Sequence, residues 1–463
     1  MQQREPGAAV RGWTALALLA VGGWWLAAVV VSARTYLMMG YATVGAKVPR
    51  LEPFLTSSAA WGFAGAIGLV WWLLVRKQVE RFLPAAIHAI RLLAVAAAPG
   101  GLYVLRALGW SAIPPTYWEP LWISAWTGAS FFHATWRQDW GTRLSHRAGL
   151  LAAALLSLGI GGWWYGQSLY YYRHYQLGYN DFGHFLQRVA NTAAGRGWLL
   201  ESPVLPPFWD HFNPGLLLLV PAWWAVPSVH LAFGLQAVSL ACGGVLVHRL
   251  ARAMGGSPWG ALAWSVAWLA QPAAGQMNLA YTYGWHPVSV ALPLLLVAIL
   301  CVLRRRIGWA LLAGVLASSM QEDVIVVTAC FCATASWVAW RQSKSLTGQW
   351  MGISGWSWAA GAALAGLVFL AVYQFSGLAE FQTGRFVALG DTPLQILFSP
   401  VLRPAAFWGE LLRPTKLAYL LSLTLPCFLP TLVRGWRILI ATGPPLLVLL
   451  VWDHLPASSL AFQ

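Results

Sequence analysis

The residues with the clearest potential for chemistry lie in one polar stretch of an otherwise apolar chain. The stretch opens as YNDFGHF with Asp181, and His184 and Arg188 follow at spacings of three and four residues. Side chains at these spacings share one face of a helix. A carboxylate, an imidazole and a guanidinium on one face could deprotonate a hydroxyl group, hold a metal ion or bind a phosphate.

Residues of the same chemical kinds recur later, at expected helix starts and in the outer loops. They are Asp210 and His211 in FWDHFNP, His286 in YGWHP, Glu322 and Asp323 in QED, and Arg385 in QTGRF. If these motifs meet Asp181, they add second acids, metal ligands or cationic groups to one site. A divalent metal is therefore a possible cofactor.

Asp181 also has a purely structural interpretation. Asn180 or Asp181 can cap a helix that Gly195 terminates, because a short polar side chain accepts from the first free N–H groups of a helix. In the same way, Asn213 followed by Pro214 indicates an N-cap and a first helical position.

The later polar residues have structural interpretations too. Glu322 and Asp323 can complement the positive end of a helix dipole. His286 can bond a backbone carbonyl at the membrane interface, and Asp210 with His211 can form a solvated pair in a loop.

The composition is that of a polytopic membrane protein. The 463 residues are 59% hydrophobic and only 9% charged, whereas soluble domains are about 25% charged. The net charge of +15 comes mostly from Lys and Arg in short loops, which is the positive-inside pattern and no sign of nucleic-acid binding. The chain contains no P-loop, HExxH or CxxC motif, so an ATP-driven pump is not expected.

The apolar runs predict an all-α bundle of about thirteen transmembrane helices. The runs are continuous rather than alternating, which favours helices over strands. The expected spans are 12–33, 58–75, 84–104, 118–135, 149–169, 228–250, 257–274, 287–303, 307–320, 323–340, 352–376, 414–431 and 436–452. They divide the chain into an N-terminal block of four spans, 1–148, and a core, 149–463, with one long outer loop, 170–227.

The basic loops predict how the chain is oriented in its membrane. All of the basic loops fall on one side of the membrane: RKQVER, RQDWGTRLSHR, HRLAR, RRR, RQSK and RGWR. The positive-inside rule assigns this side, together with the N-terminus, to the cytoplasm. All nine acids after residue 150 then fall on the outer side. The segment 213–226 is apolar but short, and both of its ends are outside, so we expect a re-entrant or interfacial helix.

The polar motifs, taken together, resemble a known family. Five motifs carry the resemblance: YNDFGHFLQRVANTAAGRG, DHFNPGLLLLVP, the span ending in HRLAR, YGWHPVSVALPLLL and QEDVIVV. In this order and spacing they resemble the bacterial membrane proteins grouped as domain of unknown function 2079. The similarity covers about residues 150–455. That family is grouped with the GT-C glycosyltransferase-like superfamily, whose members are polytopic and use lipid-phosphate-linked sugars.

The resemblance implies a role for each candidate residue. Asp181 corresponds to the acid in the first outer loop and would be the general base on an acceptor hydroxyl, with inversion at the sugar carbon. A polyprenyl phosphate would be the leaving group, bound by cationic neighbours or a metal. The cationic candidates are His184, Arg188, His211, His286 and Arg385, and the second acids or metal ligands are Asp210, Glu322 and Asp323.

The leading hypothesis, which rests on this resemblance, is therefore a glycosyltransferase of a bacterial inner (cytoplasmic) membrane, surrounded by membrane lipid. It would move a sugar from a polyprenyl-phosphate donor to an acceptor on the outer face. A transporter or flippase for a lipid-linked envelope precursor is the second hypothesis, to which Gln236, Gln271 and Gln374 point as polar residues within spans. A scaffold without catalysis is the third. The family resemblance also implies spans beyond the final WDHLPASSLAFQ, so a truncated reading frame is one interpretation of this end.

Overall fold

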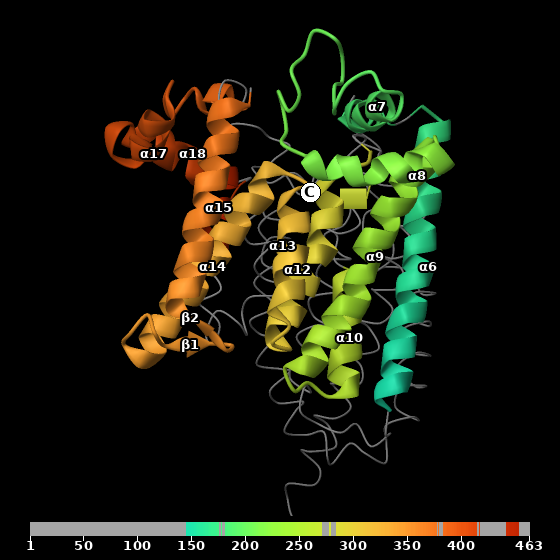
Figure 1. The fold of residues 1–463 in the computed structure, drawn as a ribbon, viewed down its shortest axis with the longest axis horizontal. Coiled ribbons are helices and arrows are strands. Elements are labelled where there is room, and N and C mark those ends of the chain that lie inside the picture. Colours follow the sequence, from blue (N-terminus) through green and yellow to red (C-terminus); the bar gives the residue numbers. More distant parts are fainter. Residues whose placement is uncertain are drawn as a thin grey trace, which may run out of the picture.

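The computed structural model describes residues 145–175, 177, 181–270, 277–278, 284–376, 378, 383–413, 416 and 441–452. The expected spans 12–33, 58–75, 84–104 and 118–135 lie outside these residues, as does 414–431 apart from residue 416. The regular elements of the described part are helices apart from one short hairpin, in agreement with the all-α prediction (Figure 1).

The long elements form a bundle, and short ones cover one of its ends. The bundle contains α6 (His146–Arg173), α9 (Val229–Ala253), α10 (Pro258–Ala270), α12 (Val288–Leu303), α13 (Ile307–Ser318), α14 (Glu322–Ser343) and α15 (Gly355–Phe375). The short elements are α7 (Asp181–Ala193), η1 (Pro214–Leu219), α8 (Val220–Ala225), η3 (Gly384–Phe386), α17 (Pro393–Leu402) and α18 (Pro404–Leu411). Strands β1 (Gln349–Trp350) and β2 (Ile353–Ser354) pair antiparallel between α14 and α15.

The two ends of the bundle differ in chemistry. At one end, which we call the α7 end, α7, α8, α17 and α18 gather (Figure 1). The opposite end, which we call the basic end, carries the arginines 304–306 between α12 and α13 and the segment 341–344 before the hairpin. The described basic loops at 304–306 and 341–344 thus lie at the end opposite the polar segments, as the sequence predicts.

Four described helices are long and apolar enough to cross a membrane: α6, α9, α14 and α15. Each overlaps a predicted span. The predicted spans at 287–303, 307–320 and 436–452 correspond to shorter apolar helices, Val288–Leu303, Ile307–Ser318 and Ala441–Val451. A twelve-residue helix such as α13 is about 18 Å long, less than the bilayer core.

Small residues allow the bundle helices to pack closely. A Cβ placed on Gly243 of α9 would lie 2.2 Å from the Trp268 ring of α10, and one on Gly244 would lie 2.7 Å from Ser157 Oγ of α6. Helices in lipid gain little from hydrophobic attraction, so close backbone approach at small residues is a main source of their association.

The apolar segment at 213–226 does not cross the bundle. It forms η1 and α8, which lie across the α7 end, so both ends of the segment are on the same side (Figure 1). The Trp224 indole donates to the Ala193 carbonyl over 3.1 Å, which ties α8 to the last turn of α7. This geometry agrees with the expected re-entrant or interfacial segment.

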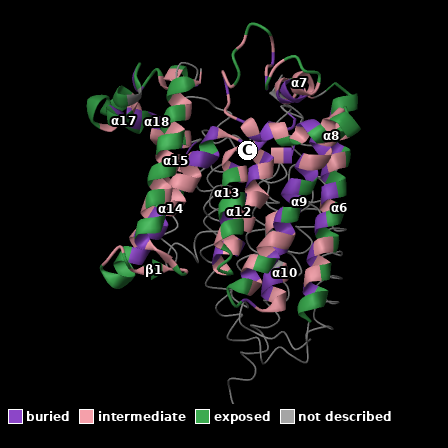
Figure 2. Cartoon of the chain, viewed as in Figure 1, coloured by how far each residue is buried: buried purple, intermediate pink, exposed green. Residues whose placement is uncertain are grey.

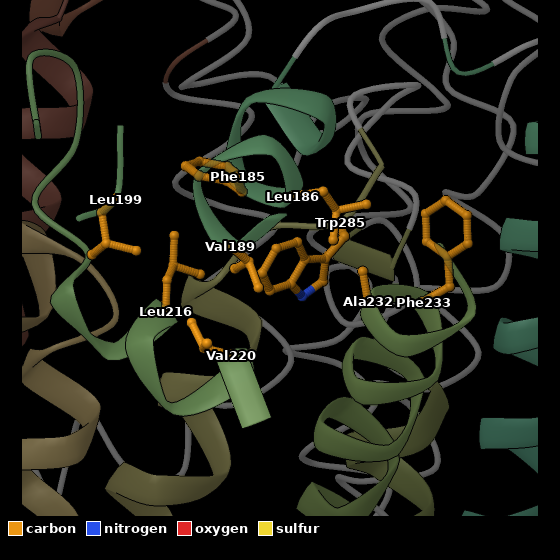
Figure 3. Close-up of a cluster of buried hydrophobic side chains, with 9 residues drawn as sticks. All are labelled: Phe185, Leu186, Val189, Leu199, Leu216, Val220, Ala232, Phe233 and Trp285. Carbon is orange, nitrogen blue, oxygen red and sulfur yellow. The ribbon is translucent and has the colours of Figure 1, made fainter. Parts of the chain in front are cut away.

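The apolar face of α7 seals this end of the bundle. Phe185, Leu186 and Val189 pack onto Leu216 and Val220 of η1 and α8 and onto Phe233 of α9 (Figure 3). Trp285, just before α12, completes this fully buried cluster. Exposed residues, in contrast, dominate α15 and α17 (Figure 2). The position of α7 is therefore fixed by apolar packing, which holds its polar face in a defined place.

Candidate functional site

Helix α7 forms where the sequence predicts it and ends for the predicted reason. It runs from Asp181 to Ala193, and Gly195 follows with φ +70°, a conformation that glycine adopts without strain. The Arg196 N–H then donates to the Asn191 carbonyl over 2.9 Å, which satisfies a free carbonyl at the helix end. Asp181 is the first residue of α7, and its side chain lies outside what the structure describes.

Arg188 is the centre of a buried charge network. Its side chain has no exposed surface, and its guanidinium donates to Glu201 Oε2 over 3.1 Å and to Asp210 Oδ1. Taking an isolated charge out of water is very unfavourable, so a buried guanidinium requires such partners. Arg188 thereby fastens the loop between α7 and η1 back onto α7.

His184 shares Arg188's carboxylate partner. Its Nδ1 pairs with Glu201 Oε1, and the Trp209 indole donates to Glu201 Oε2 over 3.2 Å. The prediction that His184 and Arg188 share one face of the helix is confirmed, because both reach the same carboxylate.

Asn213 is the N-cap residue of η1 and Pro214 follows it, as predicted, but the Asn213 side chain is used elsewhere. Its side chain makes no capping hydrogen bond to η1, and its Oδ1 accepts from Arg188 Nη1 over 3.2 Å instead. The guanidinium explains the difference, because a buried cation with several N–H groups requires every nearby acceptor. Pro214 at the helix start has no N–H to cap.

His211 links this network to the first turn of α14. The Asp210 carboxylate accepts from the His211 backbone N–H over 2.7 Å. Glu322 then receives two contacts, from the His211 imidazole at Nδ1 over 2.9 Å and from the Phe212 N–H over 2.9 Å. Glu322 therefore does more than complement its own helix dipole, because it binds a loop more than a hundred residues away in sequence.

The surrounding acids set the charge of His211. Burial by itself would lower its pKa, but the charge and hydrogen bond of Glu322 oppose burial, together with the charges of Asp210 and Asp323. Their sum raises the pKa of His211 from 6.5 to about 9. His211 is consequently an imidazolium at neutral pH, with 18% of its side chain exposed.

His286 approaches the same place from the start of α12. The Phe185 ring is a neighbour of both imidazoles: its centroid lies 5.5 Å from that of His286 and 6.1 Å from that of His211. The His286 Nδ1 faces the Gly284 carbonyl over 3.3 Å, as the structural interpretation expects. The His286 backbone N–H donates to Gln236 Oε1 over 2.9 Å, which ties this residue to α9.

Arg385 belongs to the edge of the site. Its guanidinium lies 4.5 Å from the centroid of the Trp452 ring, and it interacts electrostatically with Asp323. The Trp452 carbonyl in turn accepts from Lys416 Nζ over 2.8 Å, and Lys416 pairs with Glu410 of α18. Arg385 thus lies between the network around His211 and a second buried ion pair.

The structure brings the described candidate residues together at the α7 end. A continuous set of contacts joins His184, Arg188, Asp210, His211 and Glu322. Around this set lie His286, Asp323 and Arg385. Glu201 is the member that the sequence analysis did not single out, although it is buried and has three side-chain partners. The sequence feature that could have identified Glu201 is that it is one of few acids in the chain and lies in the same loop as Asp210.

Several described carboxylate oxygens at this end already accept hydrogen bonds. Both Glu322 oxygens are hydrogen-bonded, and Asp210 Oδ1 accepts from two groups. Within the described ranges, no group of three or more His, Cys, Asp or Glu side chains is placed to hold a metal ion. Part of the acceptor capacity of Glu322 and Asp210 is therefore used by Arg188, His211 and backbone N–H groups.

Comparison with known proteins gives a family for this chain. No curated protein and no solved structure matches it. The family described as Predicted membrane protein (DUF2079) matches residues 173–463, from the last residue of α6 onward and over most of the chain. It includes every residue of the site described above. The chain therefore belongs to the DUF2079 family of predicted membrane proteins.

Proposed function

We propose that this protein is a GT-C type glycosyltransferase that moves a sugar from a polyprenyl phosphate to an acceptor at the outer face of a bacterial inner membrane. The observation that supports it is the gathering of His184, Arg188, Asp210, His211 and Glu322 at one end of a membrane-type bundle. A lipid-linked donor requires such a place, where charged groups meet the membrane surface.

In the proposed reaction, the Asp181 carboxylate accepts the proton of the acceptor hydroxyl. The hydroxyl oxygen forms a bond to the anomeric carbon while the bond from that carbon to the phosphate oxygen breaks. The polyprenyl phosphate leaves with the electron pair, and the configuration at the sugar carbon inverts.

The described residues divide the remaining work. The His211 imidazolium, with His286 and Arg385 near it, supplies positive charge for the phosphate. Glu322 and Asp323 keep His211 protonated. Arg188, whose charge is already matched by Glu201 and Asp210, positions the loop that carries His211.

The transporter hypothesis has less support. Gln236, one of its polar residues within a span, is fully buried and bonds the backbone at Asn278 and His286. It therefore satisfies backbone groups near the α7 end rather than lining a path. Gln374 lies near the end of α15, and Gln271 lies outside the described residues.

The test uses the full-length protein in liposomes with polyprenyl phosphates that carry radiolabelled glucose, mannose or galactose, together with cell-envelope material as acceptor. We expect transfer of label to the acceptor, and at least about a hundredfold loss of transfer in Asp181→Asn, since a general base contributes roughly that factor or more. Asp391→Asn is the matched control, because Asp391 is an exposed acid before α17 whose removal should leave transfer unchanged.

Two results contradict the proposal in different ways. Equal transfer by wild type and Asp181→Asn removes the catalytic role of Asp181. Movement of the labelled lipid across the liposome membrane, with the bond from sugar to phosphate intact, favours a flippase.

A further inference from the structure

A pocket at the basic end has no part in the proposed chemistry. It lies between the last turns of α14, the hairpin region and the start of α15, and its volume is about 560 Å³. Three tryptophans, Trp337, Trp340 and Trp356, line it together with Lys344. Figure 1 shows the hairpin strands at the end of α14 and α15 that is opposite α7.

Cations lie directly over the aromatic walls of this pocket. Lys344 Nζ is 5.7 Å from the centroid of the Trp340 ring. Arg341, one helical turn after Trp337, places its guanidinium carbon 5.6 Å from the centroid of that ring. Such stacking orients a cation without neutralising it, so both charges remain able to attract an anion.

The acids are elsewhere. Those in the described part of the chain are Asp181, Glu201, Asp210, Glu322, Asp323, Asp391 and Glu410, and all belong to segments at the α7 end. Arg305, from the turn between α12 and α13, lies near Gly352 of the hairpin region and adds a further positive charge. The pocket therefore has a positive potential that no described carboxylate offsets.

The hairpin region is held firmly, so the pocket is preformed. The Gly355 and Trp356 N–H groups donate to the Gly348 and Leu346 carbonyls over 2.9 and 3.0 Å. Ser336 Oγ donates to the Gly355 carbonyl over 2.8 Å. A Cβ on Gly348 would lie 1.7 Å from Ser343 Oγ, so the chain passes this helix end too closely for a side chain.

We infer that this pocket binds an anionic phospholipid of the surrounding bilayer, with the phosphate beside Lys344 and Arg341 and the glycerol region against the tryptophan rings. Tryptophan is favoured at the depth of the headgroups, and basic pockets between membrane helices bind anionic headgroups. The exposed apolar side chains of α15, such as Leu364 and Leu367, provide a surface for the acyl chains. This inference is independent of the proposed transferase activity.

The experiment measures bound lipid directly. The full-length protein is purified in detergent with equal amounts of phosphatidylglycerol and phosphatidylcholine and washed, and native mass spectrometry counts the retained lipids. We expect wild type to retain phosphatidylglycerol in preference. Lys344→Gln and Arg341→Gln should each reduce that retention about fivefold, the size expected for one basic residue at an anionic surface. Lys344→Arg, which keeps the positive charge, should retain phosphatidylglycerol as wild type does.

Arg249→Gln is the matched control. Arg249 is an exposed cation near the end of α9, at the same end of the bundle but outside the pocket. Unchanged retention in this variant supports the pocket. An equal loss in Arg249→Gln and Lys344→Gln overturns the inference, because it indicates diffuse attraction to the whole basic end.

Three further outcomes also decide the matter. Equal retention of the two lipids by wild type overturns the inference. Displacement of the bound lipid by inorganic phosphate alone also overturns it, because it shows that the pocket recognises a free anion. Loss of phosphatidylglycerol in Trp356→Ala, with an unchanged elution volume in size-exclusion chromatography, supports the tryptophan contact.

Discussion

Arg188 is the residue whose environment is most demanding. It is fully buried and paired with Glu201 and Asp210. In Arg188→Met, both carboxylates would stay buried without their cation. Breaking a buried pair in this way costs about 3–5 kcal/mol, so we expect a large fall in the melting temperature of the purified protein in detergent.

Arg196→Gln is the control for this prediction, because Arg196 is an exposed cation just after the same helix. Its free energy of unfolding should lie within about 0.5 kcal/mol of that of wild type. A melting temperature for Arg188→Met equal to that of Arg196→Gln would show that the network contributes little to stability.

His211 should make stability depend on pH in the alkaline range. Its pKa is about 9 in the folded protein and 6.5 ordinarily, so the folded state binds the proton more tightly. The resulting stabilisation, on the order of 3 kcal/mol, is fully present below pH 6.5 and is lost as the pH rises through 9. Thermal melting of wild type from about pH 6 to about pH 10 should follow this curve.

His211→Gln should melt with a flatter dependence on pH, and Glu322→Gln should do the same by removing the main partner. Wild type and His211→Gln with parallel curves over this range would show that His211 does not carry the linkage.

At the scale of the element, the end of α7 depends on one backbone conformation. Gly195 has φ +70°, and a Cβ there would meet nothing within 4 Å. Gly195→Ala should therefore destabilise the protein by about 1 kcal/mol for conformational reasons alone. Urea unfolding followed by circular dichroism in detergent measures the difference.

Gly183→Ala provides the comparison within the same helix. A Cβ on Gly183 also has open space, but the backbone there is helical, so alanine should stabilise the helix by up to about 1 kcal/mol. Opposite signs for the two variants are expected, and equal signs would contradict the assignment of Gly195 as the helix terminator.

At the scale of the whole molecule, the two ends of the bundle should face different compartments. With the native cysteines replaced, Val204→Cys lies on an exposed loop at the α7 end and Gln342→Cys at the basic end. The positive-inside rule predicts that the basic end is cytoplasmic. A membrane-impermeant maleimide should label Val204→Cys in intact spheroplasts, and Gln342→Cys only after the membrane is opened. The reverse pattern would invert the orientation.

The sequence by itself determined the class of fold, the approximate helices and the location of the polar residues. Continuous apolar runs predicted α6, α9, α14 and α15, because a backbone in lipid must satisfy its own hydrogen bonds. Gly195 ended α7 as predicted, and the failure of η1 and α8 to cross the bundle followed from the shortness of the segment and the common side of its two flanks. These features are local, so composition and spacing are enough to predict them.

Only the tertiary structure decided which polar groups pair. Glu201 is the carboxylate that His184 and Arg188 share, the Asn213 side chain accepts from Arg188 rather than from a helix N–H group, and Glu322 binds His211 from a different element. Each pairing joins segments that are separate in sequence and meet because α7 and η1 pack on the same bundle end. A buried charge is matched by whichever acceptors that packing brings within reach, and local spacing does not contain this information.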